Sequence, residues 1–451
     1  MNFPVTPALS GPLIDLERHL LDCSTTIERW FREQWHHHVP PFYGSVDLRN
    51  AGFKLAPVDM NLFPGGFNNL GSIFLPLCVQ AAQAAVERLC ASARRVLLIP
   101  ENHTRNQFYL QNVSRLADIL RMTGLEVRLG SLLPEITSAT PVMLPNGSSL
   151  ILEPLVRQGN RLGVEGFEPC AILLNNDLSG GVPDILQGLD EQFLIPPLHA
   201  GWHMRRKSRH AAVYERIVRA FSEEIGIDPW RICPAFRVCG GIDFHARAGE
   251  ECLTQQVDAL LADIRRKYRE YDIKEEPFVV VKADAGTYGM GVMMVKEASD
   301  IVGLNRRQRN KMAVVKEGMS VGEVIIQEGI RTVESVDGAV AEPVVYMMDH
   351  YVIGGFYRVH TTRGSDENLN APGMEFRPLS FETPCCMPDC QQGIEAATNR
   401  LYVYGVIARL ALLAASVEIE ETESLTASNT NATSGCSDAM ASAQNEAPRY
   451  G

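Results

Sequence analysis

The chain of 451 residues carries 42 lysines and arginines against 54 aspartates and glutamates, a formal net charge of −12 that excludes a generally basic nucleic-acid-binding protein. With 45% apolar and 21% charged residues, 36 glycines and 26 prolines, the composition is that of a folded protein, neither collagen-like nor globally disordered. At roughly 150 residues per domain, two or three domains are expected.

Eleven cysteines are scattered irregularly along the chain, unlike the dense framework of a small disulfide-rich secreted domain. No basic segment followed by an apolar one opens the sequence. The longest charge-free apolar stretches, such as 410–417, fall well short of the roughly 20 residues that span a bilayer. The sequence therefore predicts a cytoplasmic protein with no membrane partner.

Residues 94–134 read as strand, helix, strand: an apolar run, a polar turn, a helical pattern and a second apolar run. Further short strands are predicted at 150–155 and 171–174, each followed by polar or glycine-rich residues. This alternation predicts an open α/β sheet whose loops collect polar groups at the strand ends. We expect a first, α/β domain over residues 1–200.

The chain after residue 200 is predicted to be rich in strands. Apolar residues recur at helical spacing over 251–271, which predicts an amphipathic helix. Strands are expected at 278–281, 292–295, 324–326, 344–348 and 351–353, and a last helix over about 392–415. A second domain over 201–421 would precede a disordered tail over 422–451, where serine, threonine, alanine and asparagine dominate.

The segment 278–295, FVVVKADAGTYGMGVMMV, combines a strand ending in Lys282, a loop with Gly286, Gly289 and Gly291, and a second strand. Glycines let backbone N–H groups approach phosphate oxygens closely, and a lysine adds a point charge beside them. The spacing is not that of a P-loop, and no helix follows the glycines as in a Rossmann fold. On the glycines alone, a flexible hairpin with no ligand is the alternative.

Three later segments strengthen the nucleotide interpretation. A strand at 324–330, VIIQEGI, ends in Gln327 and Glu328, which could face an adenine edge and a ribose. A predicted strand pair over 342–360 leads to Arg358. Finally, Glu367, Asn368 and Asn370 offer the carboxylate and amide oxygens that Mg²⁺ prefers.

In this order the segments resemble an ATP-grasp ligase: a glycine-rich hairpin with a lysine before it, a strand ending at the adenine, an arginine and an asparagine-bearing loop. Together with APVDMNLFPGGFNNL (56–70) and PPLHAGWHMRRKSRH (196–210), residues 278–379 look like a bacterial family of glutamate–cysteine ligases. The likeness covers nearly all of the chain before the tail. The stretch ENLNAPGMEFRPL (367–379) is also similar to glutathione synthetase.

The resemblance implies ATP-dependent amide formation between the γ-carboxylate of glutamate and the amine of cysteine, with ATP and Mg²⁺ as cofactors. It implies an α/β (α+β) fold with an N-terminal α/β amino-acid-binding domain and an ATP-grasp-like domain. Lys282 would bind phosphate, Gln327 and Glu328 would border the adenine, Arg358 would neutralise the transferring phosphate, and Asn368 would meet Mg²⁺. Where ATP-grasp enzymes have late acidic metal ligands, this chain offers Glu418, Glu420 and Glu421.

Two polar loops are candidates for amino-acid binding. The first, over 59–69, holds Asp59, which could bind an ammonium group, with Asn61, Asn68 and Asn69 around a Pro-Gly-Gly turn. A structural loop held by Asx turns is the alternative. The second, over 100–106, follows a predicted strand and offers Glu101 and Arg105, although a solvated turn fits it about as well.

A basic segment over 199–210 places Arg205 and Arg206 among histidines in an otherwise acidic protein. Local positive charge suits an anionic substrate such as glutamate or a nucleotide. A solvated basic helix face is the alternative. Nucleic-acid binding is disfavoured because the segment has neither a basic domain around it nor an aromatic platform.

We therefore expect small-molecule substrates (glutamate, cysteine and ATP), no nucleic-acid partner, and a chain that could form homo-oligomers. Two rival functions stay open. One is another ATP-grasp carboxylate–amine ligase, such as a glutathione-synthetase-like enzyme. The other is a non-catalytic nucleotide-binding regulatory protein, which would bind ATP without producing ADP.

Overall fold

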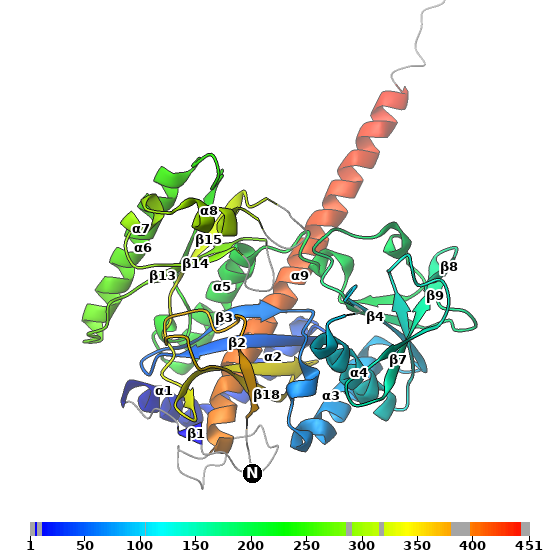
Figure 1. The fold of residues 1–451 in the computed structure, drawn as a ribbon, viewed down its shortest axis with the longest axis horizontal. Coiled ribbons are helices and arrows are strands. Elements are labelled where there is room, and N and C mark those ends of the chain that lie inside the picture. The colour runs from blue at the N-terminus through cyan, green and yellow to red at the C-terminus, as the bar shows by residue number, and fades with distance from the viewer. Residues whose placement is uncertain are drawn as a thin grey trace, which may run out of the picture.

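The computed structural model describes residues 5–6, 11–103, 105–285, 291–314, 320–379 and 397–442, with 5–6, 11–14, 397–399 and 426–442 described by their backbone only. Within these residues the strands form three larger sheets and one two-stranded ribbon, β8 (Val156–Gln158) with β9 (Arg161–Gly163). Figure 1 shows the three sheets side by side, with the central one crossed by the long C-terminal helix.

The first sheet is the predicted open α/β sheet, and its strands follow the order β11-β10-β4-β5-β7-β6. All its strand pairs are parallel except β6 with β7. Helices α3 (Leu75–Leu89) and α4 (Gln107–Met122) belong to this part of the chain. The strands are β4 (Arg95–Pro100), β5 (Glu126–Ser131), β6 (Thr140–Met143), β7 (Ser149–Pro154), β10 (Ala171–Asn175) and β11 (Phe193–Ile195).

The second sheet is antiparallel, in the order β12-β15-β13-β14. Its strands are β12 (Phe236–Gly240), β13 (Val279–Ala283), β14 (Val292–Val295) and β15 (Glu323–Glu328). The predicted amphipathic helix is confirmed as α6 (Glu250–Glu270), which buries its apolar stripe in the core of this unit. Two short helices, α7 (Ser299–Val302) and α8 (Arg306–Ala313), complete it.

The third and central sheet is antiparallel and takes strands from both ends of the chain. Strand β2 (Tyr43–Asn50) pairs with β3 (Leu55–Asn61) and with β17 (Ala339–Met348), and β17 also pairs with β18 (Tyr351–His360). The remaining strands are β1 (Val5–Thr6), β16 (Ser335–Val336) and β19 (Glu375–Pro378). The central sheet therefore joins strands from both sides of residue 200, the expected boundary between the two domains. Local periodicity in the sequence does not reveal which distant strands pair.

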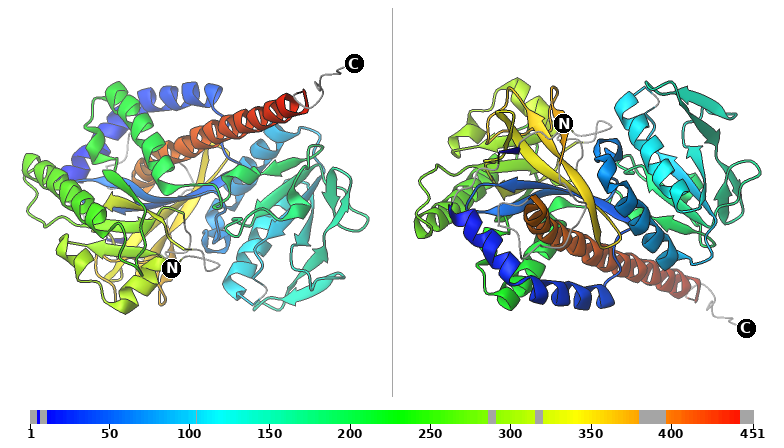
Figure 2. Two further views of the ribbon diagram at one scale, coloured as in Figure 1. Left: turned by 90° about the horizontal axis from the view of Figure 1, so that it is seen from above. Right: turned by 90° about the horizontal axis from the view of Figure 1, so that it is seen from below.

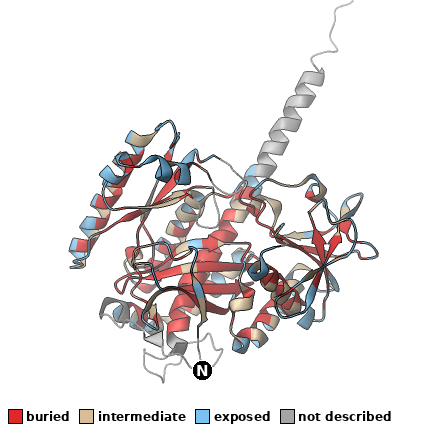
Figure 3. Cartoon of the chain, in the orientation of Figure 1, coloured by how far each residue is buried: buried red, intermediate tan, exposed pale blue. Residues whose placement is uncertain are grey.

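Helix α9 (Ala397–Ser442) packs against the central sheet, and α1 (Gly11–Asp22) and α5 (Lys207–Ile225) pack against α9. Helix α2 (Ser24–His37) contacts α5. Figure 2 shows α1, α2 and α5 on one side of α9 and the parallel sheet on the other. This arrangement explains why residues 401–415 are apolar on every side: all are buried except Arg409 (Figure 3).

Arg400–Leu425 is the only segment in the described part of the chain that is long and apolar enough to cross a bilayer, and 89% of its apolar window is buried inside the fold. The helix also extends beyond residue 421, where we expected a disordered tail: α9 continues to Ser442, and the rest of the tail lies outside the described residues. Composition alone did not indicate this extension.

Candidate active site

The main cleft lies between the two antiparallel sheets. It collects side chains from β2, β3, β17 and β18 on one side, from β13, β14 and β15 on the other, and from the loop 363–370. Its basic and acidic residues are balanced at six each: Arg49, Lys207, Lys282, Lys311, Arg358 and Arg363 with Asp47, Asp59, Glu328, Glu342, Asp366 and Glu367. A polyanionic ligand that binds in this cleft can form ion pairs with these lysines and arginines.

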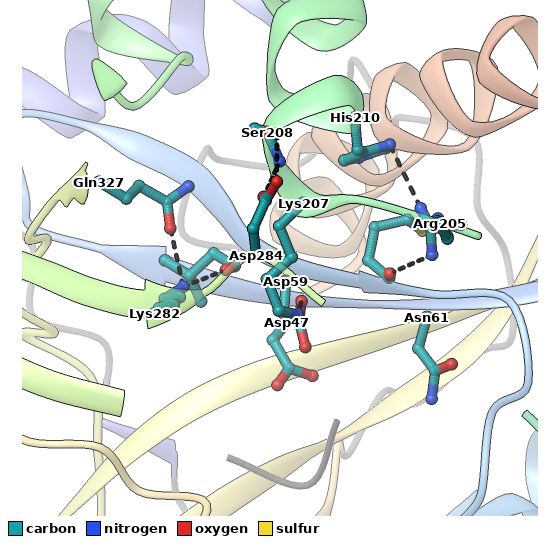
Figure 4. A network of polar contacts seen from close by, with 12 residues as sticks. Asp47, Asp59, Asn61, Arg205, Lys207, Ser208, His210, Lys282, Asp284 and Gln327 are labelled. Atoms are coloured by element: carbon teal, nitrogen blue, oxygen red, sulfur yellow. Dashed lines mark hydrogen bonds and ion pairs between the residues drawn. The ribbon is translucent and has the colours of Figure 1, made fainter. Parts of the chain in front are cut away.

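Lys282 projects from β13 into this cleft. Its Nζ donates to the backbone oxygen of Val58 and to Oε1 of Gln327, each at 2.7 Å (Figure 4). Burial lowers the pKa of Lys282 to about 8, although the nearby carboxylate of Asp59 acts to raise it. The predicted hairpin is confirmed in β13 and β14, and Gly291 at its edge has a φ of 60°.

The other predicted glycines of the hairpin, Gly286 and Gly289, lie outside the described residues. The two ends of the hairpin are fixed, because the amide N–H of Ala283 donates to the carbonyl of Gly291 at 2.9 Å.

Arg358 is held by two carboxylates. Its Nη1 lies 2.7 Å from Oδ2 of Asp47 and 2.6 Å from Oε1 of Glu342, and Nε of Arg49 donates to the second oxygen of Glu342 at 2.8 Å. Burial acts to lower the pKa of Arg358, but the two carboxylates outweigh it and raise that pKa. The two arginines in turn hold the pKa of Glu342 below its usual value against the effect of burial. The four side chains form a charge-balanced cluster in one wall of the cleft.

Asp59 faces a lysine of the protein itself: Nζ of Lys207 lies 2.7 Å from its Oδ1. Burial acts to raise the pKa of Asp59, but the charges of Lys207 and Lys282 lower it to about 2. The carboxylate is therefore ionised at neutral pH. Its side chain is still 45% exposed, so it is also accessible to a ligand.

The N-terminus of α5 is tied to the end of β13 by Asp284. Its carboxylate accepts hydrogen bonds from the backbone N–H of Ser208 at 2.7 Å and from the Ser208 hydroxyl at 2.6 Å. Its carbonyl accepts from the N–H of Lys207 at 3.0 Å. Asp284 thus joins the strand that carries Lys282 to the helix that carries Lys207.

A second chamber adjoins the main cleft and shares Val58, Asp59, Lys207, Lys282 and Gln327 with it. Its remaining lining is mostly apolar: Pro57, Met60, Trp202, Arg205, His210, Ala211, Tyr214, Pro234 and Ile325. The ring of Trp202 lies under Nζ of Lys207, 4.5 Å from its centroid. A small ligand with a charged end and a short apolar side chain fits this chemistry.

Arg205, a predicted substrate-binding residue, lines this chamber. Its guanidinium forms hydrogen bonds with other groups of the protein. It donates to both oxygens of Glu418 at 3.1 Å and to the carbonyl of Met60 at 2.8 Å. Burial acts to raise the pKa of Glu418, but Arg205 and His210 together outweigh it and lower that pKa to about 2. The other two late carboxylates pair elsewhere, Glu420 with His38 and Glu421 with Arg216. None of the three lines the main cleft.

The predicted metal residues Glu367, Asn368 and Asn370 all line the main cleft. The carboxylate of Glu367 accepts from Arg363 and from the N–H of Gly364, each at 2.7 Å, and the side chain of Asn368 accepts from the N–H of Asn370 at 2.9 Å. Over the described residues, no group of three or more histidine, cysteine, aspartate or glutamate side chains is placed to hold a metal. Few protein ligands combined with substrate phosphates suit Mg²⁺, so the oxygens of this loop fit that ion.

Glu328 lines the cleft, but its carboxylate forms hydrogen bonds with groups of the protein interior. It accepts from Nζ of Lys54 at 2.6 Å, from Nε1 of Trp230 at 3.2 Å and from the N–H of Ala235 at 2.9 Å. Both Lys54 and Glu328 are almost fully buried. An adenine could meet only other atoms of Glu328 while this pair persists.

The remaining predicted substrate residues do not line either cavity: Asn61, Asn68, Asn69, Glu101, Arg105 and Arg206. Asn61 forms an Asx turn with the N–H of Phe63 at 2.9 Å and lies apart from the dashed network in Figure 4. Glu101 accepts from the N–H of Asp177 at 3.0 Å, and Arg206 donates to the carbonyl of Arg205 at 2.9 Å. Their role in substrate binding stays a prediction.

Sequence reasoning missed several charged residues of the site: Asp47, Arg49, Asp284 and Glu342. A signal existed for some of them. Asp47 and Arg49 alternate with apolar residues in VDLR, and Asp284 stands two residues after Lys282. Charged residues in an apolar strand are rarely buried without partners, so they indicate a polar cluster or a site.

Comparisons with known proteins place the chain among amide-forming ligases. The glutamate-cysteine ligase family model matches residues 17–419. A solved structure from Methylobacillus flagellatus KT, described as a candidate gamma-glutamylcysteine synthetase, is 65% identical, with a TM-score of 0.87 over 94% of this chain and 99% of that one. D-alanyl-alanine synthetase A from Vibrio cholerae O1 biovar eltor str. N16961 is 9% identical, with a TM-score of 0.31 over 71% of this chain and 81% of that one, too low to carry an argument. A search of curated proteins gives no match.

Proposed function

Because this chain belongs to the glutamate–cysteine ligase family, we propose that it joins the γ-carboxylate of L-glutamate to the amine of L-cysteine at the expense of ATP. The products are γ-glutamylcysteine, ADP and phosphate. This is the first step of glutathione biosynthesis. The reducing cytoplasm suits it, since cysteine must stay a thiol, and the irregular cysteine usage of the chain agrees with that location.

One observation carries the assignment of the site. Residues singled out from separate stretches of sequence line a single cleft between two antiparallel sheets: Lys282, Gln327, Arg358, Asn368 and Asn370. We assign ATP to this cleft, with the phosphates near Lys282 and the adenine beside Gln327 and the apolar wall formed by Val280, Met294 and Ile330.

The chemistry requires an activated carboxylate. Since a carboxylate is a poor electrophile at neutral pH, the γ-carboxylate of glutamate first takes the terminal phosphoryl group of ATP, and the cysteine amine then displaces phosphate from the acyl phosphate. No covalent enzyme nucleophile is needed. The protein must position the groups and stabilise the charge on the transferring oxygens.

Lys282 and Arg358 supply that charge differently. Lys282 can exchange its two hydrogen bonds, to Val58 and Gln327, for a phosphate oxygen. Arg358 is bound to Asp47 and Glu342, so it adds little net charge and instead holds two carboxylates beside the phosphates. We assign phosphate binding to Lys282 and a mainly positioning role to Arg358.

The oxygens of Glu367, Asn368 and Asn370 would hold Mg²⁺ together with the ATP phosphates. When bound, the ion neutralises phosphate charge and favours phosphoryl transfer. Asp47 adds a carboxylate to the same cleft.

Glutamate and cysteine must reach the terminal phosphate from the side away from the adenine. Asp59 faces both cavities, and Arg205 lines the second chamber. Asn61, Asn68, Asn69, Glu101, Arg105 and Arg206 remain proposed contacts for the amino acids, reached if the cleft closes around substrate.

The test is ADP release by purified protein with Mg-ATP, glutamate and cysteine, with each component omitted in turn and the product identified by mass spectrometry. ADP that depends on both amino acids, with a product at the mass of γ-glutamylcysteine, is expected. Turnover only with a different acid and amine would select another ATP-dependent ligase. ATP binding without ADP production under any combination would select the regulatory function.

A further inference from the structure

His210 stands in the second chamber with a carboxylate behind it. Its Nδ1 lies 3.1 Å from Oε2 of Glu418, and the side chain is 15% exposed. Arg205 donates to both oxygens of the same carboxylate. The three side chains form a short chain that runs from α9 to the chamber wall, and Figure 4 shows the His210 and Arg205 end of it.

The hydrogen bonds determine which nitrogen of His210 carries the proton. An ionised carboxylate only accepts hydrogen bonds, and an arginine only donates them. Nδ1 lies 3.1 Å from Oε2 of Glu418 and 3.3 Å from Nη2 of Arg205, and that Nη2 already donates to the same carboxylate oxygen, so we assign the hydrogen of Nδ1 to the contact with Glu418. In the neutral ring Nε2 is then an acceptor, and it has no hydrogen-bond partner in the described part of the chain.

The surroundings favour the neutral form of this ring. Burial lowers the pKa of His210, and the charge of Arg205 lowers it further, while Glu418 and Asp59 act to raise it. Lys207, one turn earlier on α5, adds a second positive charge in the same chamber, and Tyr214 stacks on the ring at a centroid distance of 6.5 Å. A neutral histidine with an open Nε2 can accept a proton.

The chamber is placed for the second half of the reaction. It opens onto the cleft at Asp59, Lys207 and Lys282, which line both cavities. Its other walls are mostly apolar, so it suits a short uncharged side chain better than the second carboxylate of glutamate. The amine substrate fits here, beside the cleft in which the acyl phosphate forms.

We propose that this chamber binds the amine substrate and that His210 is the general base of the ligation step, an inference that rests on the function proposed above. The free amino acid carries an ammonium group, which cannot attack. Nε2 of His210 takes one ammonium proton, the nitrogen lone pair forms the C–N bond, and the C–O bond to phosphate breaks. Phosphate leaves with the electron pair, and Glu418 stabilises the imidazolium. The peptide nitrogen then loses a second proton to phosphate or solvent.

The deciding variant is His210→Asn. The amide nitrogen of asparagine takes the place of Nδ1 and can still donate to Glu418, whereas nothing replaces Nε2. The matched control is His38→Asn, because His38 also pairs through Nδ1 with a carboxylate of α9, Glu420, at 2.8 Å but lines neither cavity. Both proteins are compared with wild type for thermal unfolding and for product formation at saturating ATP and glutamate.

Each protein is assayed at pH 7 with two amines, cysteine and hydroxylamine. Hydroxylamine is already unprotonated at this pH, so its attack on the acyl phosphate needs no base. His210→Asn should lose about 100-fold or more of its rate with cysteine and keep its rate of hydroxamate formation within about threefold. His38→Asn should match wild type with both amines.

Equal losses with cysteine and hydroxylamine, or no loss with either, would overturn the role of His210 as base. If wild type does not use hydroxylamine, the pH profile decides: the rate of His210→Asn with cysteine must recover as the pH rises from about 7 to 9 and the amine deprotonates by itself. A variant profile parallel to that of wild type overturns the inference. Failure of wild type to make any product would instead reject the proposed function.

Discussion

Asp284 and Ser208 link two parts of the site that lie far apart in the sequence. The carboxylate of Asp284, at the end of β13, accepts from both the backbone N–H and the hydroxyl of Ser208, in the first turn of α5, at 2.7 and 2.6 Å. Asp284 is almost fully buried, and its charge lies at the positive end of the helix dipole. The link fixes the distance between Lys282 and Lys207.

Asp284→Ala should therefore cost both stability and ATP use. Losing a helix-capping carboxylate typically costs about 1–2 kcal/mol, measured here as a lower midpoint of urea unfolding. The kcat/KM for ATP should fall about tenfold or more, since small misplacements of a binding cation are costly. Ser208→Ala, which removes only the hydroxyl bond, should show a smaller loss of both. Wild-type kinetics in Asp284→Ala would show that the link is structural alone.

Lys282→Ala should cut turnover by orders of magnitude while leaving the fold intact. The cation acts mostly where charge develops on the transferring phosphate, so its loss appears in kcat. Stability should change little, because burial already disfavours the charged lysine. Near-normal turnover, with a matching thermal unfolding curve, would remove Lys282 from the phosphate site.

The same lysine predicts a pH dependence. Burial lowers the pKa of Lys282 to about 8 in the free protein, so the cation is present below that pH and is lost as the pH rises through it. The kcat/KM for ATP should fall above pH 8, since this ratio reports ionisations of the free enzyme. Lys282→Arg keeps its charge at all accessible pH values, so the decrease in kcat/KM should shift to higher pH or disappear. An identical decrease in this variant would assign the ionisation to another group.

Arg358→Ala should act first on folding. Removing this guanidinium leaves Asp47 without its partner and Glu342 with Arg49 alone, and breaking a buried ion pair from one side typically costs about 3–5 kcal/mol. Activity should fall even in the folded fraction, because the two carboxylates beside the phosphates lose their fixed positions. Arg358→Lys should recover only part of the stability. The lysine keeps the positive charge, but its ammonium group cannot bridge both carboxylates as well as the guanidinium does. A loss of activity below about tenfold with full stability would contradict this account.

The sequence was sufficient for the elements whose signal is local. The stripe of α6, the apolar runs of β13 and β14, and the strand–helix–strand pattern of β4, α4 and β5 all follow from periodicity, and their bounds agree with the prediction within a few residues. Lys282, Gln327 and Arg358 were found because they terminate or occupy such strands.

Long-range pairing could not be predicted. Strand β2 contributes Asp47 and Arg49 to the cleft by pairing with β17, about three hundred residues later, and no local pattern encodes that choice. The partners of charged groups were equally hidden. Asp59 was expected to meet a substrate ammonium, and in the fold its carboxylate pairs with Lys207. A sequence shows which side chains carry charge, whereas the fold decides how far neighbours already neutralise them.

Glu328 gives a direct test of that difference, because its position at the end of β15 suggested adenine binding while its carboxylate pairs with buried Lys54. Lys54→Met leaves the Glu328 carboxylate buried with only two neutral N–H donors, from Trp230 and Ala235, and should destabilise the protein by about 3–5 kcal/mol. Glu328→Gln keeps an acceptor for those donors but leaves the lysine charge uncompensated over the Trp230 ring, 4.4 Å from its centroid. It should also destabilise the fold, while the KM for ATP in the folded protein changes less than about threefold.

The double variant Lys54→Met/Glu328→Gln removes both charges and should be more stable than either single variant, which urea unfolding of the three proteins measures. A large rise in KM for ATP in Glu328→Gln at unchanged stability would return the carboxylate to the adenine site.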